Sequence, residues 1–213
     1  MTAAEAAAIG AWRVLGVGDR VGAVFNDRDC IEVRARRSRA TVLQILAAVV
    51  TQNQALGVGR GLVSAPAMLN TALDHARRRA PHDAAVIIIS DFDGADAATR
   101  DMVAALARHN DVVAAMVHDP LQSDLPPSAS MTVTDGELQI RLDVGRDSVR
   151  KSVSQLTRDR LKGIFDWTRE LGIPVLPLSA AEDTAAQLRR LLGGLPAGRG
   201  RAAPHNQTEA ALG

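Results

Sequence analysis

The chain has 213 residues, which is enough for one domain with a full hydrophobic core. Hydrophobic residues make up 46% of it and charged residues 23%, as in folded proteins, and a net charge of only +1 argues against binding nucleic acid or anionic lipid through charge alone. Cys30 is the only cysteine, which excludes an internal disulfide bond and a cysteine-based zinc site. No apolar run reaches the roughly 18–20 residues of a membrane span, and the first residues do not resemble a signal peptide, so we expect a cytoplasmic protein.

The first third of the chain predicts a β-hairpin followed by two helices. Residues 20–26 (RVGAVFN) form a candidate strand, and the alternation in residues 31–35 predicts a half-exposed strand that returns beside it. Ser38 is a suitable cap for the first helix, and Ser64 for the second, which has Pro66 in its first turn. The residues expected to face inward are Val42, Leu46 and Val49 in the first helix and Met68, Leu69, Ala72 and Leu73 in the second.

The rest of the chain alternates apolar strands with helices. Residues 86–89, 112–117 and 175–178 predict buried parallel strands, because each is a short apolar run between helix-like segments. A hairpin with its turn at residues 135–136 is predicted within residues 131–144. Helices are expected near residues 102–106, over residues 149–171, and after Ser179, which forms a capping box with Glu182. Residues 1–194 are therefore expected to be one domain and residues 195–213 a disordered tail.

Polar residues follow each predicted parallel strand. Ser90 and Asp91 come after the first of them, His118 and Asp119 after the second, and Ser179 after the third. Ligands of open parallel sheets bind beyond the carboxyl ends of the strands, so we expect a binding surface there. The expected binding rim consists of four residues: Ser90, Asp91, Asp93 and Asp119.

The stretch SDFDG, residues 90–94, has two interpretations. In the structural one, Asp93 caps a helix that begins near Ala95 and Asp91 accepts backbone N–H bonds. In the enzymatic one, the stretch resembles the first motif of haloacid-dehalogenase-type phosphatases, where Asp91 would attack phosphorus, Asp93 would transfer protons and magnesium would bridge the charges. That motif normally lies on the first strand, continues with Thr or Val and has a downstream Lys and acidic motif, none of which is matched here. We therefore expect no enzyme and assign no catalytic residue.

Several stretches together resemble one family. In order they are GDRVGAVFND, VIIISDFDG, LARHNDVVAAMVHDPLQSDLPPS, TDGE and LGIPVLPLSAAEDTAAQLRRLL. They resemble the bacterial domain of unknown function 58 (DUF58) family, which contains a von Willebrand factor A-like domain, and the HDP…LPP segment followed by DGE is the most specific part. The resemblance implies an α/β fold: a Rossmann-like, mostly parallel sheet in the strand order 3-2-1-4-5-6, with helices on both faces and an inserted β-hairpin.

The same resemblance implies a departure at the amino terminus. In von Willebrand A domains the first strand ends in Asp-x-Ser-x-Ser, which supplies three metal ligands, and a Thr from a second loop and an Asp after the fourth strand complete the site. Asp91 matches that Asp and Ser64 lies near the second-loop position, but the Asp-x-Ser-x-Ser motif is absent from the sequence. The first, central strand is therefore expected to be missing, and the domain to be truncated at its N-terminus. Magnesium, which needs several oxygen ligands, is expected only if such a segment exists upstream.

The resemblance implies a role in binding. Proteins of this family commonly accompany MoxR-type AAA+ ATPases and are thought to act as binding or assembly partners. We therefore expect a non-enzymatic protein-binding module with a MoxR-type AAA+ ATPase as partner. Two alternatives stay open: a haloacid-dehalogenase-like phosphatase using Asp91 and Asp93, and a metal-dependent adhesion-type binding domain with Asp91 and Ser64 as weak candidate ligands.

Overall fold

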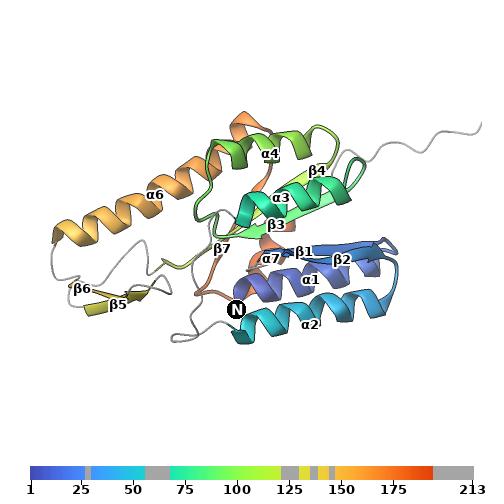
Figure 1. Ribbon diagram of the computed structural model, residues 1–213, viewed down its shortest axis with the longest axis horizontal. Helices are drawn as coiled ribbons and strands as arrows, with labels where there is room; N and C mark the ends of the chain where they lie inside the picture. The colour runs from blue at the N-terminus through green and yellow to red at the C-terminus, as the bar shows by residue number, and fades with distance from the viewer. Residues whose placement is uncertain (27–29, 56–67, 121–129, 135–138, 144–146, 194–213) are drawn as a thin grey trace, which may run out of the picture.

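The structure is a computed structural model that describes residues 1–26, 30–55, 68–120, 130–134, 139–143 and 147–193 (Figure 1). The predicted tail, Ser64, Pro66 and the turn at residues 135–136 lie outside these residues. The helices are α1 (Thr2–Gly16), α2 (Arg39–Ala55), α3 (Met68–Arg79), α4 (Ala97–Ala107), α6 (Asp147–Glu170) and α7 (Thr184–Gly193). The strands are β1 (Val21–Asn26), β2 (Cys30–Arg36), β3 (Ala85–Ser90), β4 (Asp111–His118), β5 (Ser130–Thr134), β6 (Gln139–Asp143) and β7 (Val175–Ser179).

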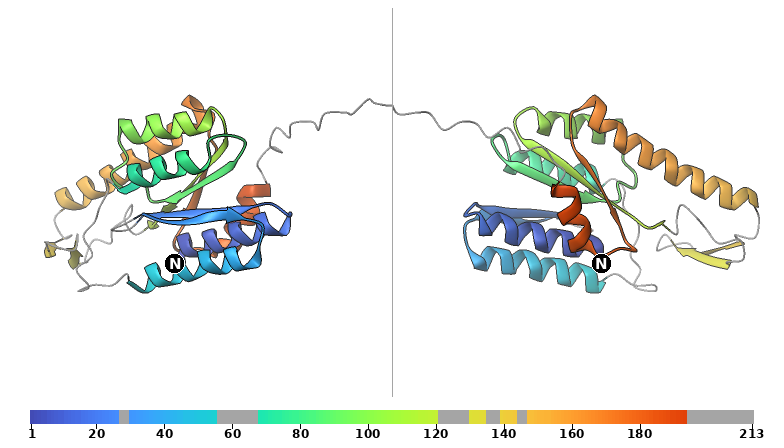
Figure 2. Two further views of the ribbon diagram at one scale, coloured as in Figure 1. Left: turned by 45° about the vertical axis from the view of Figure 1, so that its right-hand side comes forward. Right: turned by 180° about the vertical axis from the view of Figure 1, so that it is seen from behind.

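The three predicted buried strands form one parallel sheet in the order β3-β4-β7, which confirms this part of the sequence prediction. Helices cover both of its faces (Figures 1 and 2). On one face, α3, α4 and α6 pack over a core that includes Ile88, Ala114 and Met116. On the other, α1 and α7 pack over Ala115 and Leu178. Burial on both faces explains why these strands are continuous apolar runs in the sequence.

The predicted amino-terminal hairpin is also confirmed. β1 and β2 pair antiparallel, and their pairing is irregular between Val21 and Ala23. Gly22 lies between these two residues, and a larger residue would not fit there. A Cβ on Gly22 would come within 2.8 Å of the Val33 carbonyl oxygen. The helix that follows, α2, begins as predicted, with the Ser38 hydroxyl accepting the Thr41 N–H at 3.1 Å.

The strands do not join into the single sheet that the strand order 3-2-1-4-5-6 requires. Within the described residues, β1-β2, β3-β4-β7 and β5-β6 are three separate sheets, and no ladder connects β1 with β3. The described chain is thus a mixed α/β protein with a three-stranded parallel sheet and two hairpins. The von Willebrand A-like architecture and the missing central strand stay predictions. None of the described helices is long and apolar enough to cross a membrane.

Candidate functional site

The carboxyl ends of β3, β4 and β7 lie at one edge of the parallel sheet, as the sequence predicted. Ser90 is in register with Met116, and His118 with Ser179, so the residues after these positions meet at the same edge. A cavity of about 180 Å³ lies there. Eight residues line it: Asp91, Met116, Val117, His118, Asp119, Arg160, Leu161 and Ala180. Of the four predicted rim residues, Asp91 and Asp119 therefore share this cavity, whereas Ser90 and Asp93 are not among its lining residues.

The loop after β3 is held by short-range hydrogen bonds. The Ser90 hydroxyl accepts the Phe92 N–H at 3.0 Å, and the Asp91 carboxylate accepts the Asp93 N–H at 3.1 Å. Such bonds from a side chain to the backbone two residues later are typical of tight turns. The predicted structural role of Asp91 is thus confirmed, and its side chain is exposed at the same time.

Phe92 fixes the conformation of this loop. Its backbone has a φ of 55°, which is unusual for a bulky side chain, and the side chain is fully buried. The ring packs edge-on against Trp167 of α6, with 5.4 Å between the ring centroids and 89° between the planes. A left-handed backbone at a non-glycine residue persists only where the surroundings hold it, and here the buried ring does so. The neighbouring aspartates are consequently displayed on a rigid turn.

Asp93 forms an ion pair and does not cap a helix. Its carboxylate lies 2.8 Å from the Arg160 guanidinium of α6. The prediction that Asp93 caps a helix near Ala95 was wrong: α4 begins at Ala97, and Asp96 is its N-cap. The positive φ of Phe92 and of Gly94 lengthens the turn, so the helix begins later than the sequence suggested.

Asp96 anchors α4 through a network that the sequence pattern does not reveal. Its carboxylate accepts the Thr99 N–H at 2.8 Å and a bond from the Asn70 amide at 3.2 Å. The buried Thr99 hydroxyl in turn donates to the Asn70 carbonyl oxygen at 2.6 Å. The Thr99 N–H, followed by the Asn70 and Thr99 side chains, holds the pKa of Asp96 below its usual value. The network joins the start of α4 to α3.

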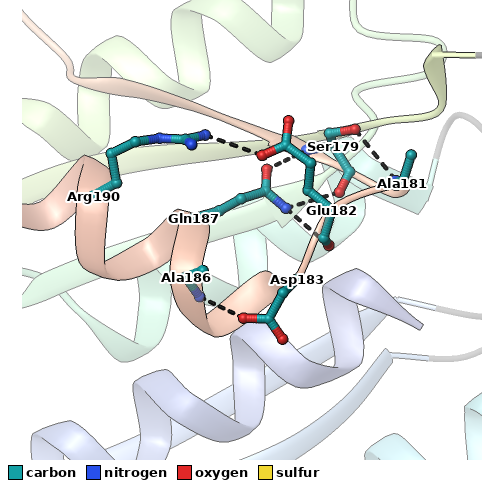
Figure 3. Close-up of polar contacts among 7 residues, drawn as sticks. All are labelled: Ser179, Ala181, Glu182, Asp183, Ala186, Gln187 and Arg190. Atoms are coloured by element: carbon teal, nitrogen blue, oxygen red, sulfur yellow. Dashed lines mark hydrogen bonds and ion pairs between the residues drawn. The ribbon is translucent and has the colours of Figure 1, made fainter.

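The loop after β7 is held by Gln187 of α7 (Figure 3). This buried amide accepts the Ser179 N–H at 2.7 Å and donates to the Ser179 carbonyl oxygen at 2.9 Å. The predicted capping box of Ser179 and Glu182 was wrong. Asp183 caps α7 by accepting the Ala186 N–H at 2.7 Å, while Glu182 pairs with Arg190 at 3.2 Å. Ser179 cannot cap because its backbone still belongs to β7 and is bonded to Gln187.

His118 adds a polar group to the cavity. Its Nδ1 atom is buried and has no hydrogen-bond partner among the described residues. Because this atom has almost no exposed surface, the ring lines the cavity through its other atoms. Arg160 could not be singled out from the sequence, since nothing in the α6 pattern distinguishes it from the other arginines of that helix.

The described residues do not make up a magnesium site. In the part of the chain that the structure describes, no three His, Cys, Asp or Glu side chains gather closely enough to hold a metal ion. Ser64, the other candidate ligand, lies outside the described residues. Asp91 is a single carboxylate with one oxygen already bonded to the Asp93 N–H, whereas Mg²⁺ needs several oxygen ligands in octahedral geometry.

These features define a class of protein: an α/β domain with a parallel sheet, helices on both faces and a polar rim at the carboxyl edge. Residues 1–162 match the model of the family described as "Protein of unknown function DUF58". The match covers more than half of the chain, so the chain belongs to the DUF58 family, as the motifs indicated. No curated protein and no solved structure matches the chain.

Proposed function

We propose that the chain is a non-enzymatic protein-binding module of von Willebrand A-like architecture, and that it binds its partner at the carboxyl edge of the parallel sheet. The observation that carries this proposal is the cavity beside Asp91, in which carboxylates, an arginine and apolar side chains surround about 180 Å³. The order of the parallel strands and the helices on both faces support the architecture.

The size of the cavity favours a protein ligand over a small molecule. Sites for small molecules usually enclose about 300–1,000 Å³, which is well above the 180 Å³ found here. A cavity of this size can take one side chain of a partner, with the rest of the contact on the surrounding surface. The loop beside it needs no rearrangement on binding, because the buried Phe92 ring already holds it in place.

The charges favour a basic side chain as the group that enters. Asp91 is exposed, and among the described residues its carboxylate forms no ion pair, whereas the Arg160 charge is paired with Asp93. A lysine or arginine of the partner can bond to Asp91 while its aliphatic stem packs on Met116 and Leu161. Charge-assisted bonds of this kind give an interface its specificity.

The family resemblance supplies the partner: a MoxR-type AAA+ ATPase. The test is calorimetric titration of a purified ATPase of this type with the wild-type chain and two charge-reversal variants. Asp91→Lys should weaken binding about tenfold or more, since it puts a positive charge where a partner's cation would lie. Asp111→Lys is the matched control, because Asp111 is an exposed aspartate at the opposite end of the sheet, where β4 begins. It should bind within about twofold of wild type.

Two results would overturn the proposal. If wild type does not bind the ATPase, the partner is wrong, and if both variants bind like wild type, the surface is wrong. The enzymatic alternative is tested separately with p-nitrophenyl phosphate and magnesium, for which we expect no turnover. Turnover that disappears in both Asp91→Asn and Asp93→Asn would establish the phosphatase instead.

A further inference from the structure

The outward side of α2 is apolar and carries no charge. Residues 40–55 of this helix contain no charged side chain, whereas each of the other described helices has at least one exposed charged residue. Leu43 and Val50 are 58% and 51% exposed, and Ala47 between them is exposed as well. These three residues are spaced by four and three positions, so they lie on one side of the helix. We call Leu43, Ala47 and Val50 the outer face of α2.

The inner side of α2 already has its packing partners. Val42 and Ile45 are buried in a core with Ala11 of α1 and Val21 of β1. Figures 1 and 2 show α2 at the margin of the molecule, with α1 and the hairpin on one side of it only. A helix that is apolar on all sides is normally buried on all sides, and a contiguous apolar patch at a surface marks a contact with another molecule. The outer face therefore needs a cover that the described residues do not supply.

The charges near α2 are placed against the dipole of the helix. Arg36, Arg37 and Arg39 are exposed where the helix begins, and none of them forms an ion pair in the described part of the chain, unlike Arg79 and Arg190. The start of a helix carries partial positive charge, so cations are unfavourable there, and its end carries partial negative charge. The last turn of α2 contains no basic residue that would balance this negative end. The two ends of α2 are consequently complementary to each other in charge.

We propose that two copies of this chain associate through the outer face of α2, with the two helices packed antiparallel about a twofold axis near Ala47. Leu43 and Val50 then lie about 5 Å along the helix on either side of the axis, so Leu43 of one copy meets Val50 of the other. The small side chain of Ala47 lets the helices approach closely where they cross. The arginines at the start of each helix lie beside the end of the other helix, where its partial negative charge stabilises them. Such a pair uses the same surface twice, as twofold dimers do.

A second copy fits this face better than a lipid surface does. A helix that lies on an anionic membrane has basic residues along the borders of its apolar face. The borders of this face include the uncharged Gln44 and Thr51, and the arginines are confined to one end of the helix. A parallel pair of copies is disfavoured, because it would bring the two sets of arginines together. Since the outer face is only one helix wide, the contact is smaller than that of a permanent dimer, and we expect a Kd of about 10–100 µM.

Analytical ultracentrifugation of the full chain tests the association. Between about 5 and 500 µM, wild type should change from monomer to dimer. Leu43→Glu and Val50→Lys should each weaken the dimer about tenfold or more, because each places a charge against an apolar side chain of the other copy. The double variant Leu43→Glu/Val50→Lys should recover most of this loss, because antiparallel packing then sets opposite charges against each other. Phe165→Glu is the matched control and should dimerise like wild type, since it removes a 41% exposed apolar side chain from α6, which packs over the parallel sheet.

Cysteine cross-linking tests the orientation without adding a charge to the face. In a Cys30→Ser background, Ala47→Cys should form an intermolecular disulfide in oxidised glutathione, because the two copies of position 47 meet at the axis. Val50→Cys is the matched control, since it lies on the same exposed face. Antiparallel packing separates its two copies by about 10 Å along the helix, which exceeds the roughly 4.4–6.8 Å between the Cα atoms of a disulfide. Ala47→Cys should therefore cross-link about tenfold faster than Val50→Cys.

Three results would overturn the proposal. They are a wild type that stays monomeric at about 500 µM, a dimer that Leu43→Glu leaves unchanged, and Val50→Cys cross-linking as fast as Ala47→Cys. Should circular dichroism show that Leu43→Glu fails to fold, the two cysteine variants decide. With a monomeric wild type, cosedimentation with vesicles of phosphatidylserine and phosphatidylcholine that Val50→Lys changes would assign the face to a membrane instead. None of these measurements involves Asp91 or the ATPase, so this proposal and the proposed function fail separately.

Discussion

Replacing Phe92 by glycine is expected to destabilise the protein less than replacing it by alanine. The two variants lose the same buried ring and its contact with Trp167. They differ in how well the new residue tolerates a φ of 55°. At most positions a glycine variant is less stable than the alanine variant. A more stable glycine variant at position 92 would therefore be a specific consequence of the left-handed turn.

The expected magnitudes follow from the environment of the ring. Removing a fully buried Phe side chain costs about 3–5 kcal/mol, which is a large share of the roughly 5–15 kcal/mol that stabilises a domain. In the left-handed conformation alanine costs about 1–2 kcal/mol, whereas the freer unfolded chain of the glycine variant costs about 0.4–1 kcal/mol. Phe92→Gly should therefore be more stable than Phe92→Ala by about 0.5–1 kcal/mol.

Urea unfolding followed by circular dichroism measures this difference. With a slope of about 2 kcal/mol per molar urea, the two midpoints should differ by about 0.2–0.5 M. Val103 is the matched control, because it is fully buried in the middle of α4. There Val103→Gly should be less stable than Val103→Ala by about 1 kcal/mol. If Phe92→Ala equals or exceeds Phe92→Gly in stability, the turn is not held left-handed and the rigid rim of the proposed function loses its basis.

Three further outcomes are expected. Gln187→Leu should lower the free energy of unfolding by about 1–3 kcal/mol, because it leaves the buried Ser179 N–H without its acceptor and leaves the Ser179 carbonyl only the long bond from the Glu182 N–H, and an unchanged urea midpoint would contradict this. The lowered pKa of Asp96 stabilises the fold fully above its usual value of 3.8, and this contribution is lost as the pH falls through the folded value. Acid should therefore lower the urea midpoint of wild type more steeply than that of Asp96→Asn, and parallel curves would refute the assignment. Millimolar magnesium should leave the Tm unchanged, and a rise that Asp91→Ala abolishes would reveal a metal site.

The strands were predictable because their burial shows directly in the sequence. Residues 86–89, 112–117 and 175–178 are apolar throughout since helices cover the sheet on both faces, and no tertiary detail is needed to find them. Their carboxyl ends could be predicted for the same reason, since parallel strands end at one edge. The sequence alone therefore predicts that Asp91 and Asp119 lie close together, and both line the same cavity.

The caps were not predictable because they depend on distant contacts. The stretch after β3 offers Asp91, Asp93 and Asp96, and each can cap a helix by local chemistry alone. Phe92 decides among them, since its contact with Trp167 holds the left-handed turn that delays the helix to Ala97. Local capping preferences show only which aspartates could cap α4. The packing of the Phe92 ring against α6 determines that Asp96 does so.

The cap of α7, after β7, is likewise determined by a contact that the local sequence does not show. Ser179 followed by Glu182 matches a capping box by spacing. In the structure, however, the Gln187 side chain of α7 is hydrogen-bonded to the Ser179 N–H and carbonyl oxygen. Asp183 then becomes the cap. A buried glutamine in an otherwise amphipathic helix is the signal that could have shown this, because a buried amide requires polar partners nearby.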